Sequence, residues 1–333
     1  MAAPLVCVRD AALSATVLSR RELRYAEGAD AALDRPGHVR AGSSLAWFGR
    51  RIAVVQDDAN FVALFDPDSG QVGAWTLPAG AGGRRQFDER RGNKPHKLDL
   101  EACFSAPTGL VALGSGSSPQ RETLALIAAD GQARLFPAPG LYARLHAAQA
   151  FSGGELNVEG AVFVDGVVRL FNRGNGAWRD GVPPRNASCD ILWAEFAAYL
   201  QGGAAPALRN IVEYDLGALD GAPLTFTDAS ATASGLLYTA AAEASPDAVT
   251  DGVVTGSAVG VLAGATGRWI ELRDADGALL AEKVEGICPV AGRDGIIYVA
   301  VDADDPDRPT MLCEVALRGP WFQPASFSED SAQ

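Results

Sequence analysis

A short pattern recurs along this 333-residue chain, and it restricts the possible folds more than any other feature of the sequence. Each copy begins with an oxygen-bearing side chain, continues through a short apolar run, and turns at Gly into a second apolar run. The first residues lie 58, 58, 69 and 57 positions apart, and they are Ser43, Glu101, Glu159, Asp228 and Glu285. A regular period of this length is typical of a repeat architecture.

The apolar runs have the composition of β-strands. They are rich in Val, Ile, Leu and aromatic residues, and clusters of Gly, Asp, Asn and Pro separate them. Each unit holds further runs of this kind, as at 61–65 and 71–77 in the first unit. Four strands per unit is the content of a propeller blade. Only residues 190–201 suggest a helix, and the first half of that stretch suits a strand equally well.

We therefore predict an all-β fold, a single five-bladed β-propeller with four-stranded blades. The unit that begins at Glu285 has room for about three strands, whereas apolar segments within residues 1–30 have no blade of their own. A strand from residues 1–30 would complete the last blade and cover its open edge. The propeller would span residues 1–323, followed by a flexible tail at 324–333. A β-sandwich or a pair of barrels also contains such runs, but neither predicts the spacing.

The first residue of each unit is expected to face one mouth of the central channel, because the innermost strand of a propeller blade lines the axis. Carboxylates held close together raise one another's pKa values or bind a cation. The set contains no His or Cys, and oxygen ligands with room for water suit Ca²⁺ or a similar hard divalent cation. The predicted metal ligands are Ser43, Glu101, Glu159, Asp228 and Glu285. Alternatively, these acids only bond backbone amides and lock the ring.

Polar residues follow the second strand of several units and are expected at the same mouth. Asp57 and Asp58 could orient a metal-bound water as a general base, and Arg173 could hold an anionic group. These three are the candidate catalytic residues. Candidate substrate-binding residues are Gln56, Ser115, Arg121, Asn175 and Glu243.

Two classes of function stay open at this point. One is a metal-dependent hydrolase of a phosphate ester or another small anionic ester. The other is a non-catalytic propeller that binds a ligand or a protein and uses an axial ion for stability. Redox and serine-hydrolase classes are disfavoured, because no Gly-x-Gly-x-x-Gly motif joins a strand to a helix and only His38, His96 and His146 are available for a triad.

The charge and the apolar pattern restrict partners and location. A net charge of −13 disfavours nucleic acid and anionic membranes as partners. The basic stretch at 84–97 is either a solvated loop or a lip over a site for an anionic ligand. No apolar run approaches the roughly 18 residues of a membrane span. Arg9 and Asp10 interrupt any signal core, so a cytoplasmic location is expected. The five cysteines lack metal-ligand spacing and are expected to be free thiols in the core.

The motifs that open the units resemble those of the soluble calcium-activated nucleotidases, or apyrases. Blades of that family open with motifs of the type Ser-Glu-Leu, Glu-Trp, His-Glu-Ser, Phe-Ser-Ser and Tyr-Glu-Gly. The corresponding motifs here are Ser43-Ser-Leu, Leu100-Glu-Ala, Val158-Glu-Gly, Thr227-Asp-Ala and Val284-Glu-Gly.

A further motif, Val55-Gln-Asp-Asp, is similar to the Val-Asp-Asp of the apyrases, whereas Asp228 stands where that family has Ser. The resemblance implies a five-bladed propeller with an axial calcium more directly than it implies nucleotide hydrolysis. The chain also resembles a group of uncharacterised bacterial propeller proteins.

Overall fold

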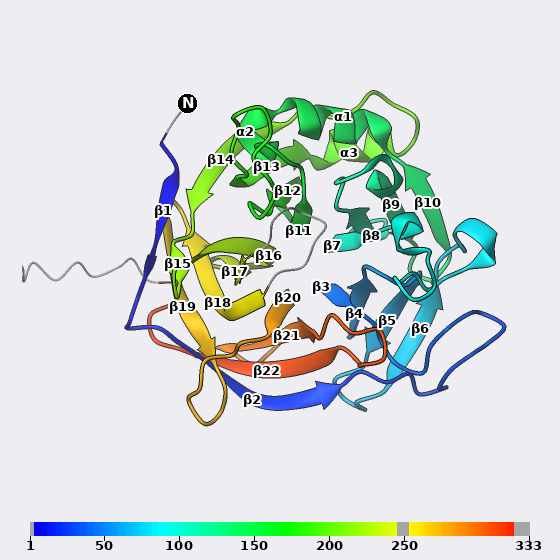
Figure 1. Ribbon diagram of the computed structural model, residues 1–333, viewed down its shortest axis with the longest axis horizontal. Coiled ribbons are helices and arrows are strands. Elements are labelled where there is room, and N and C mark those ends of the chain that lie inside the picture. The colour runs from blue at the N-terminus through cyan, green and yellow to red at the C-terminus, as the bar shows by residue number, and fades with distance from the viewer. Residues whose placement is uncertain (1–2, 245–252, 323–333) are drawn as a thin grey trace, which may run out of the picture.

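The structure is a computed structural model that describes residues 3–244 and 253–322. Most of these residues lie in or between β-strands, and helix accounts for about 9% of the chain. Pairing between consecutive antiparallel strands produces groups of four strands. Figure 1 shows the groups arranged around a common centre, with the first strand of each group innermost. This is an all-β, propeller-like architecture, as the repeat predicts.

The first three groups follow one another along the chain. The first contains β3 (Gly42–Phe48), β4 (Arg51–Gln56), β5 (Phe61–Phe65) and β6 (Val72–Thr76). The second contains β7 (Leu100–Ala106), β8 (Gly109–Gly114), β9 (Thr123–Ile127) and β10 (Ala133–Pro137). The third contains β11 (Val158–Val164), β12 (Val167–Asn172), β13 (Asn186–Leu192) and β14 (Arg209–Asp215).

The remaining two groups use longer strands and one strand from the start of the chain. The fourth contains β16 (Ala222–Thr232), β17 (Gly235–Ala244), β18 (Val253–Ala263) and β19 (Thr266–Arg273), with the short β15 (Ala218–Leu219) beside β16. The fifth contains β20 (Lys283–Pro289), β21 (Ile296–Asp302), β22 (Met311–Arg318) and β2 (Ser14–Glu22).

The two N-terminal strands lie in different places at the periphery of the ring (Figure 1). Strand β2 pairs antiparallel with β22 along its whole length and covers the outer edge of the fifth group. Strand β1 (Leu5–Arg9) instead runs parallel to both β14 and β19, and so links the third and fourth groups. Of residues 1–30, which the sequence analysis assigned to the last blade, only β2 pairs there. The predicted tail at 324–333 lies outside the described residues.

The apolar core fills the spaces between neighbouring groups. Each apolar cluster among the described residues takes its members from two adjacent groups. Val62 of β5 shares one cluster with Leu110 of β8, which joins the first group to the second. Ile52 of β4 shares another with Tyr298 of β21, which joins the first group to the fifth and closes the circle. Burial of this apolar surface holds the groups in their ring order.

A β-bulge interrupts the pairing of the innermost strand in every group. The register between β7 and β8 shifts between Leu100 and Ala102, which leaves Glu101 without a ladder partner. A bulge sets two residues opposite one and re-aims the side chain of the extra residue. The equivalent shifts leave out Ser43, Glu159, Thr227 and Glu285.

The fourth bulge corrects the predicted register of the fourth repeat. The residue that the shift leaves out is Thr227, and Asp228 pairs with Thr239 as an ordinary ladder residue. Thr227, and not Asp228, is therefore the counterpart of Glu101. The bulge positions then lie 58, 58, 68 and 58 residues apart, which is more regular than the predicted spacing.

Helices lie on the periphery of the second and third groups (Figure 1). The predicted ambiguity at 190–201 has a simple resolution, because β13 occupies its first part and α3 (Trp193–Tyr199) follows directly. Two helices were not predicted, α1 (Pro139–Ala147) and α2 (Gln149–Ser152). Pro139 opens α1, where its missing N–H costs nothing, and Leu141, Tyr142 and Leu145 give α1 one buried face.

The prediction of free cysteines in the core is confirmed. The thiols are all buried and unpaired, and they belong to Cys7, Cys103, Cys189, Cys288 and Cys313. Within 3–244 and 253–322, no helix combines the length and the apolar character that a membrane span requires. Three 3₁₀ turns complete the described elements, at Ala81–Gly83, Lys94–His96 and Pro119–Arg121.

Candidate functional site

A cavity of about 300 Å³ lies at the end of the ring where the inner strands begin. Its wall contains residues that precede or open β3, β7, β11 and β20, together with residues that follow β4, β8, β12 and β21. No described residue of β16 contributes to the wall. The predicted site residues in the wall are Ser43, Asp57, Asp58, Glu101, Arg121, Glu159, Arg173, Asn175 and Glu285.

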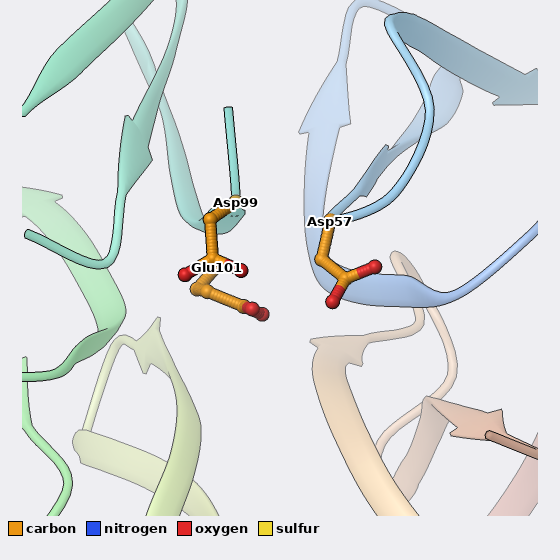
Figure 2. Close-up of side chains that lie close together, drawn as sticks. All are labelled: Asp57, Asp99 and Glu101. Atoms are coloured by element: carbon orange, nitrogen blue, oxygen red, sulfur yellow. The ribbon is translucent and has the colours of Figure 1, made fainter. Parts of the chain in front are cut away.

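Three carboxylates from two neighbouring groups come together in this cavity. Asp57 follows β4, Asp99 precedes β7, and Glu101 occupies the bulge of β7. One oxygen atom from each lies within 4.8 Å of the others. Figure 2 shows the carboxylates of Asp99 and Glu101 approaching that of Asp57 from the neighbouring group. Burial and the charges of Asp99 and Asp57 raise the pKa of Glu101 well above its ordinary value.

The chain places one of its own cations within this cluster. Lys97 donates to Asp57 Oδ2 at 2.5 Å and to Asp99 Oδ1 at 2.6 Å, and its side chain is 9% exposed. Although burial lowers the pKa of Lys97, attraction from Asp57 and Asp99 raises it well above its ordinary value. Among the described residues, no group donates a hydrogen bond to the carboxylate of Glu101, and none forms an ion pair with it. Lys97 therefore neutralises part of the negative charge that would otherwise be balanced by raised pKa values or by a bound metal cation.

Arg121 and Ser115 support Asp99 from the other side. Arg121 Nη1 forms an ion pair with Asp99 Oδ2 at 2.9 Å and donates a hydrogen bond to Ser117 Oγ at 2.7 Å. Ser115 is buried, donates to the same Asp99 oxygen, and does not line the cavity. Arg121 is therefore already paired with the carboxylate of Asp99, and Ser115 orients that carboxylate.

Arg173 is buried between carboxylates. It is only 2% exposed. Its Nη1 lies 3.2 Å from Glu159 Oε1 and its Nη2 lies 2.5 Å from Glu243 Oε2, while Nε donates to Thr225 Oγ1 at 3.1 Å. Each end of the guanidinium is thus engaged, and Glu243 lies behind the cavity wall. The pairing joins the third group to the fourth.

Asp228 lies apart from the cavity, in the centre of the inner strands. Its Oδ2 accepts from Ile287 N at 3.0 Å and Leu45 N at 3.4 Å, and its Oδ1 accepts from Ser44 Oγ at 3.2 Å. Burial raises the pKa of Asp228 well above its ordinary value. The bulge at Thr227 shifts Asp228 by one position, which takes it away from the other predicted ligands. Asp228 therefore locks three inner strands together through backbone amides, the alternative left open above.

Gln56 and Asp58, at the end of β4 and just after it, have different roles. Gln56 is buried behind the wall, where its amide donates to Tyr25 Oη and Phe61 O and its carbonyl accepts from Arg40 N. Asp58 lines the cavity and accepts a hydrogen bond from Arg40, which is 2% exposed. Burial and the charge of Asp57 raise the pKa of Asp58 to about 7. Gln56 is thus a structural residue, and Asp58 faces the cavity with one charge partner.

A second acidic set lies on β20 and at the end of β21. Lys283 donates to Glu285 Oε1 at 2.7 Å, and its Nζ lies 4.0 Å from Asp304 Oδ1. Asp302, the counterpart of Arg173 at the end of the second strand, also lines the cavity. Burial raises the pKa of Glu285 to about 7, with Lys283 opposing and Glu159 adding to that shift.

Titration of Glu285 gives the protein an expected pH dependence. Its folded pKa of about 7 exceeds the ordinary value of 4.5, so the stabilising contribution is fully present below pH 4.5 and is lost as the pH rises through 7. The free energy of unfolding should fall by up to about 3 kcal/mol from this group between those limits. Urea unfolding across this pH range should show the loss, and Glu285→Gln should flatten the profile. A profile that is equally steep in the variant would contradict the assignment.

Several cavity residues were missed by the sequence analysis. Asp99, Asn157 and Lys283 each stand two positions before a bulge residue and line the same cavity. Residues two apart in a strand share a face, so counting back two positions from each bulge could have found them. Lys97 belongs to the basic stretch at 84–97, but its burial could not be read from the sequence.

The cavity wall is acidic overall. Among the described residues, eleven Asp or Glu residues line it, against six Lys or Arg residues. The basic stretch contributes Arg90, Lys94 and Lys97 to this wall, and of these Lys97 is buried whereas Arg90 is exposed. An acidic surplus favours ligands of positive charge.

The fold and the cavity together define an all-β, propeller-like protein with an acidic central cavity. The chain belongs to a family of unknown function (DUF6929), whose model matches residues 38–317. That range begins before β3 and ends within β22, so β1 and β2 lie outside it. No curated protein matches the chain.

The chain is also similar to solved structures at low sequence identity. Streptogramin B lyase is 10% identical, with a TM-score of 0.36 and coverage of 90% of this chain and 98% of that one. The PQQ domain of pyranose dehydrogenase from Coprinopsis cinerea is 11% identical, with a TM-score of 0.37 and coverage of 89% and 87%. The WD40 repeats of RRP9 are 12% identical, with a TM-score of 0.38 and coverage of 87% and 78%. The resemblance to apyrases stays a prediction.

Proposed function

We propose that the strand groups are the blades of a single five-bladed propeller whose central cavity binds a hard divalent cation such as Ca²⁺. The circle of apolar clusters between adjacent groups supports the blade count. The repeated bulge supports a common role for the inner strands, because four of the five bulge residues, Ser43, Glu101, Glu159 and Glu285, line the same cavity.

The observation that carries the cation site is the cluster of Asp57, Asp99 and Glu101. Their oxygen atoms lie within 4.8 Å of one another. Calcium binds oxygen at about 2.3–2.6 Å, so two ligands on opposite sides of the ion lie roughly 5 Å apart. Asp57 Oδ1 is buried without a hydrogen-bond partner, which leaves one oxygen of this cluster available in addition to those of Glu101.

The chemistry of the wall supports a hard cation over a soft one. No His or Cys lines the cavity, whereas carboxylates and the amide oxygens of Asn157 and Asn175 do. Such oxygen donors suit calcium and disfavour zinc and copper. Of the residues predicted to bind the ion, Glu101 is retained in this proposal and Asp228 is not.

The contacts of the wall give less support to hydrolysis of an anionic ester. Arg121 and Arg173, the predicted anion contacts, already bind Asp99, Glu159 and Glu243. The acidic surplus also opposes an anion that arrives without its own cation. We therefore favour a cation-binding propeller over an ester hydrolase.

Calcium should raise the unfolding temperature of the protein, and Glu101→Gln should remove most of that increase. Binding to the folded state alone adds about 2.7 kcal/mol of stability when free calcium is 100 times Kd. The glutamine keeps the shape of Glu101 but removes a charge that has no ion-pair partner among the described residues. Thermal unfolding with calcium titration, alongside calorimetric titration, measures both quantities.

A charge-matched control separates this site from general effects of acidity. Glu27 is 82% exposed and lies outside the cavity, so Glu27→Gln should keep the full calcium response. A wild-type protein that shows no thermal shift and no binding heat at millimolar calcium would refute the proposal. An unchanged response in Glu101→Gln would remove Glu101 from the site.

A further inference from the structure

The cavity contains more unpaired acceptors than donors. Among the described residues, the buried wall atoms without a hydrogen-bond partner are Asp57 Oδ1, Asp58 Oδ1, Glu285 Oε2 and Arg121 Nε. Three of these four atoms are carboxylate oxygens. Buried polar atoms in proteins are nearly always paired, so an excess of acceptors indicates a ligand that donates hydrogen bonds.

Glu285 is the most enclosed of these acceptors and lies outside the cluster of Asp57, Asp99 and Glu101. It is 4% exposed and lines the cavity from the bulge of β20. Its Oε1 binds Lys283, and its Oε2 has no partner. One half of a buried carboxylate therefore lacks a donor, and the proposed divalent-cation site does not supply one.

The surroundings of Glu285 favour a positively charged donor. Lys283 and Arg173 act on Glu285 as cations, and Glu159, Asp302 and Asp304 line the same cavity. Among the described residues, carboxylates thus outnumber cations around Glu285. A neutral donor would satisfy the hydrogen bond, but only a cation would also reduce this surplus.

The chain itself shows which cations these carboxylates accept. Lys97 binds Asp57 and Asp99 through its ammonium group at 2.5 and 2.6 Å. Arg40 binds Asp58 through its guanidinium group. Nitrogen cations with several N–H donors therefore fit the carboxylates of this wall.

We propose that Glu285 anchors a subsite for the ammonium or guanidinium group of a small organic cation. The cavity volume of about 300 Å³ is at the lower end of the range for ligand pockets, about 300–1,000 Å³, so the ligand is small. Asp302 supplies further negative charge beside the bound group. The subsite is separate from the proposed Ca²⁺ cluster and does not require the divalent cation to be bound.

Calorimetric titration of the full chain with putrescine and agmatine tests this subsite. Putrescine carries an ammonium group at each end of its carbon chain, whereas agmatine carries a guanidinium group at one end of the same chain. The difference between their affinities therefore indicates which cation the subsite prefers. Butane-1,4-diol and succinate are the neutral and anionic controls of equal length. We expect at least one of the two cations to bind and neither control to do so.

Glu285→Gln should weaken binding of the organic cation by about 30-fold or more, because it removes the charge of a buried pair. Its thermal response to calcium should remain, since Glu285 lies outside the calcium cluster. Glu27→Gln, an exposed change of equal charge, should bind as the wild type does. If Glu285→Gln fails to fold, Asp302→Asn serves in its place and should also weaken binding.

Different outcomes separate this inference from the proposed function. Calcium binding without binding of putrescine or agmatine would overturn the subsite and leave the cation site intact. Binding of an organic cation without any calcium response would overturn the proposed calcium site and leave the subsite intact. Equal affinity for the organic cation in wild type, Glu285→Gln and Asp302→Asn would place the ligand elsewhere and overturn the subsite.

Discussion

Replacement of Arg173 by Met should lower the free energy of unfolding by about 3–5 kcal/mol, the cost of breaking a buried ion pair on one side. The guanidinium is 2% exposed and binds both Glu159 and Glu243. Methionine fills part of the same space but removes the cation that both buried carboxylates bind. Urea unfolding near neutral pH measures the change.

Two comparisons make this result specific. Arg50 is 89% exposed and pairs with the exposed Asp68, so Arg50→Met should cost no more than about 1 kcal/mol. Adding Glu243→Gln to Arg173→Met should recover part of the loss, because one of the two buried negative charges beside position 173 disappears. A loss below about 1 kcal/mol in Arg173→Met would show that water reaches this pair and that its burial has been overestimated.

Lys97→Met should make the stability of the protein strongly dependent on calcium. Without calcium, Asp57 and Asp99 lose their shared cation, and the free energy of unfolding should fall by about 3–5 kcal/mol. With calcium, the ion should replace the lysine and restore most of that loss. The affinity of Lys97→Met for calcium should also exceed that of the wild type by about tenfold or more, because a competing charge has been removed.

Lys94→Met is the matched control for this prediction. Lys94 also lines the cavity, but its side chain is 31% exposed and its partner Glu89 is 81% exposed. We expect little change in stability and in the calcium response, since an exposed pair contributes little. If calcium does not restore Lys97→Met while Lys94→Met behaves as the wild type, the ion does not bind at Asp57 and Asp99.

The sequence predicts the scaffold well because the information is periodic. Strands β5 and β6 follow from the apolar runs predicted at 61–65 and 71–77, and their bounds differ from the prediction by at most one residue. The helix α1 was not predicted because its signal is a Pro followed by a weakly amphipathic run, which local pattern alone does not separate from a loop. The position of β1 depends on pairing with β14 and β19, which no local pattern encodes.

The sequence predicts the site less completely, because chemistry depends on register and on partners. The acids at Glu101, Glu159 and Glu285 lie in the wall as expected, but an error of one residue exchanged Thr227 for Asp228. A shift of one residue in a strand moves a side chain to the other face, which is why Asp228 binds backbone amides instead.

The second reason why the sequence predicts the site incompletely is that it does not reveal the partners of each ion pair. Arg173 was expected to meet a ligand because it follows a strand among glycines and asparagines. Its actual neighbours are Glu159, in the same group, and Glu243, which is 70 residues later in the chain. Spacing predicts where a side chain lies along the ring, but it does not reveal which charge from the next group reaches it.

The repeated bulge sets apart the residues that hold the sheets together from the residues that would select a ligand. A bulge residue has no partner in the backbone ladder, so its side chain can change without altering the strand register. The chain already shows this freedom, since Ser43 and Thr227 occupy the same position as three glutamates. Four of the five bulge residues, Ser43, Glu101, Glu159 and Glu285, line the cavity, and an engineer could vary these positions to change ligand preference while the strands keep their pairing.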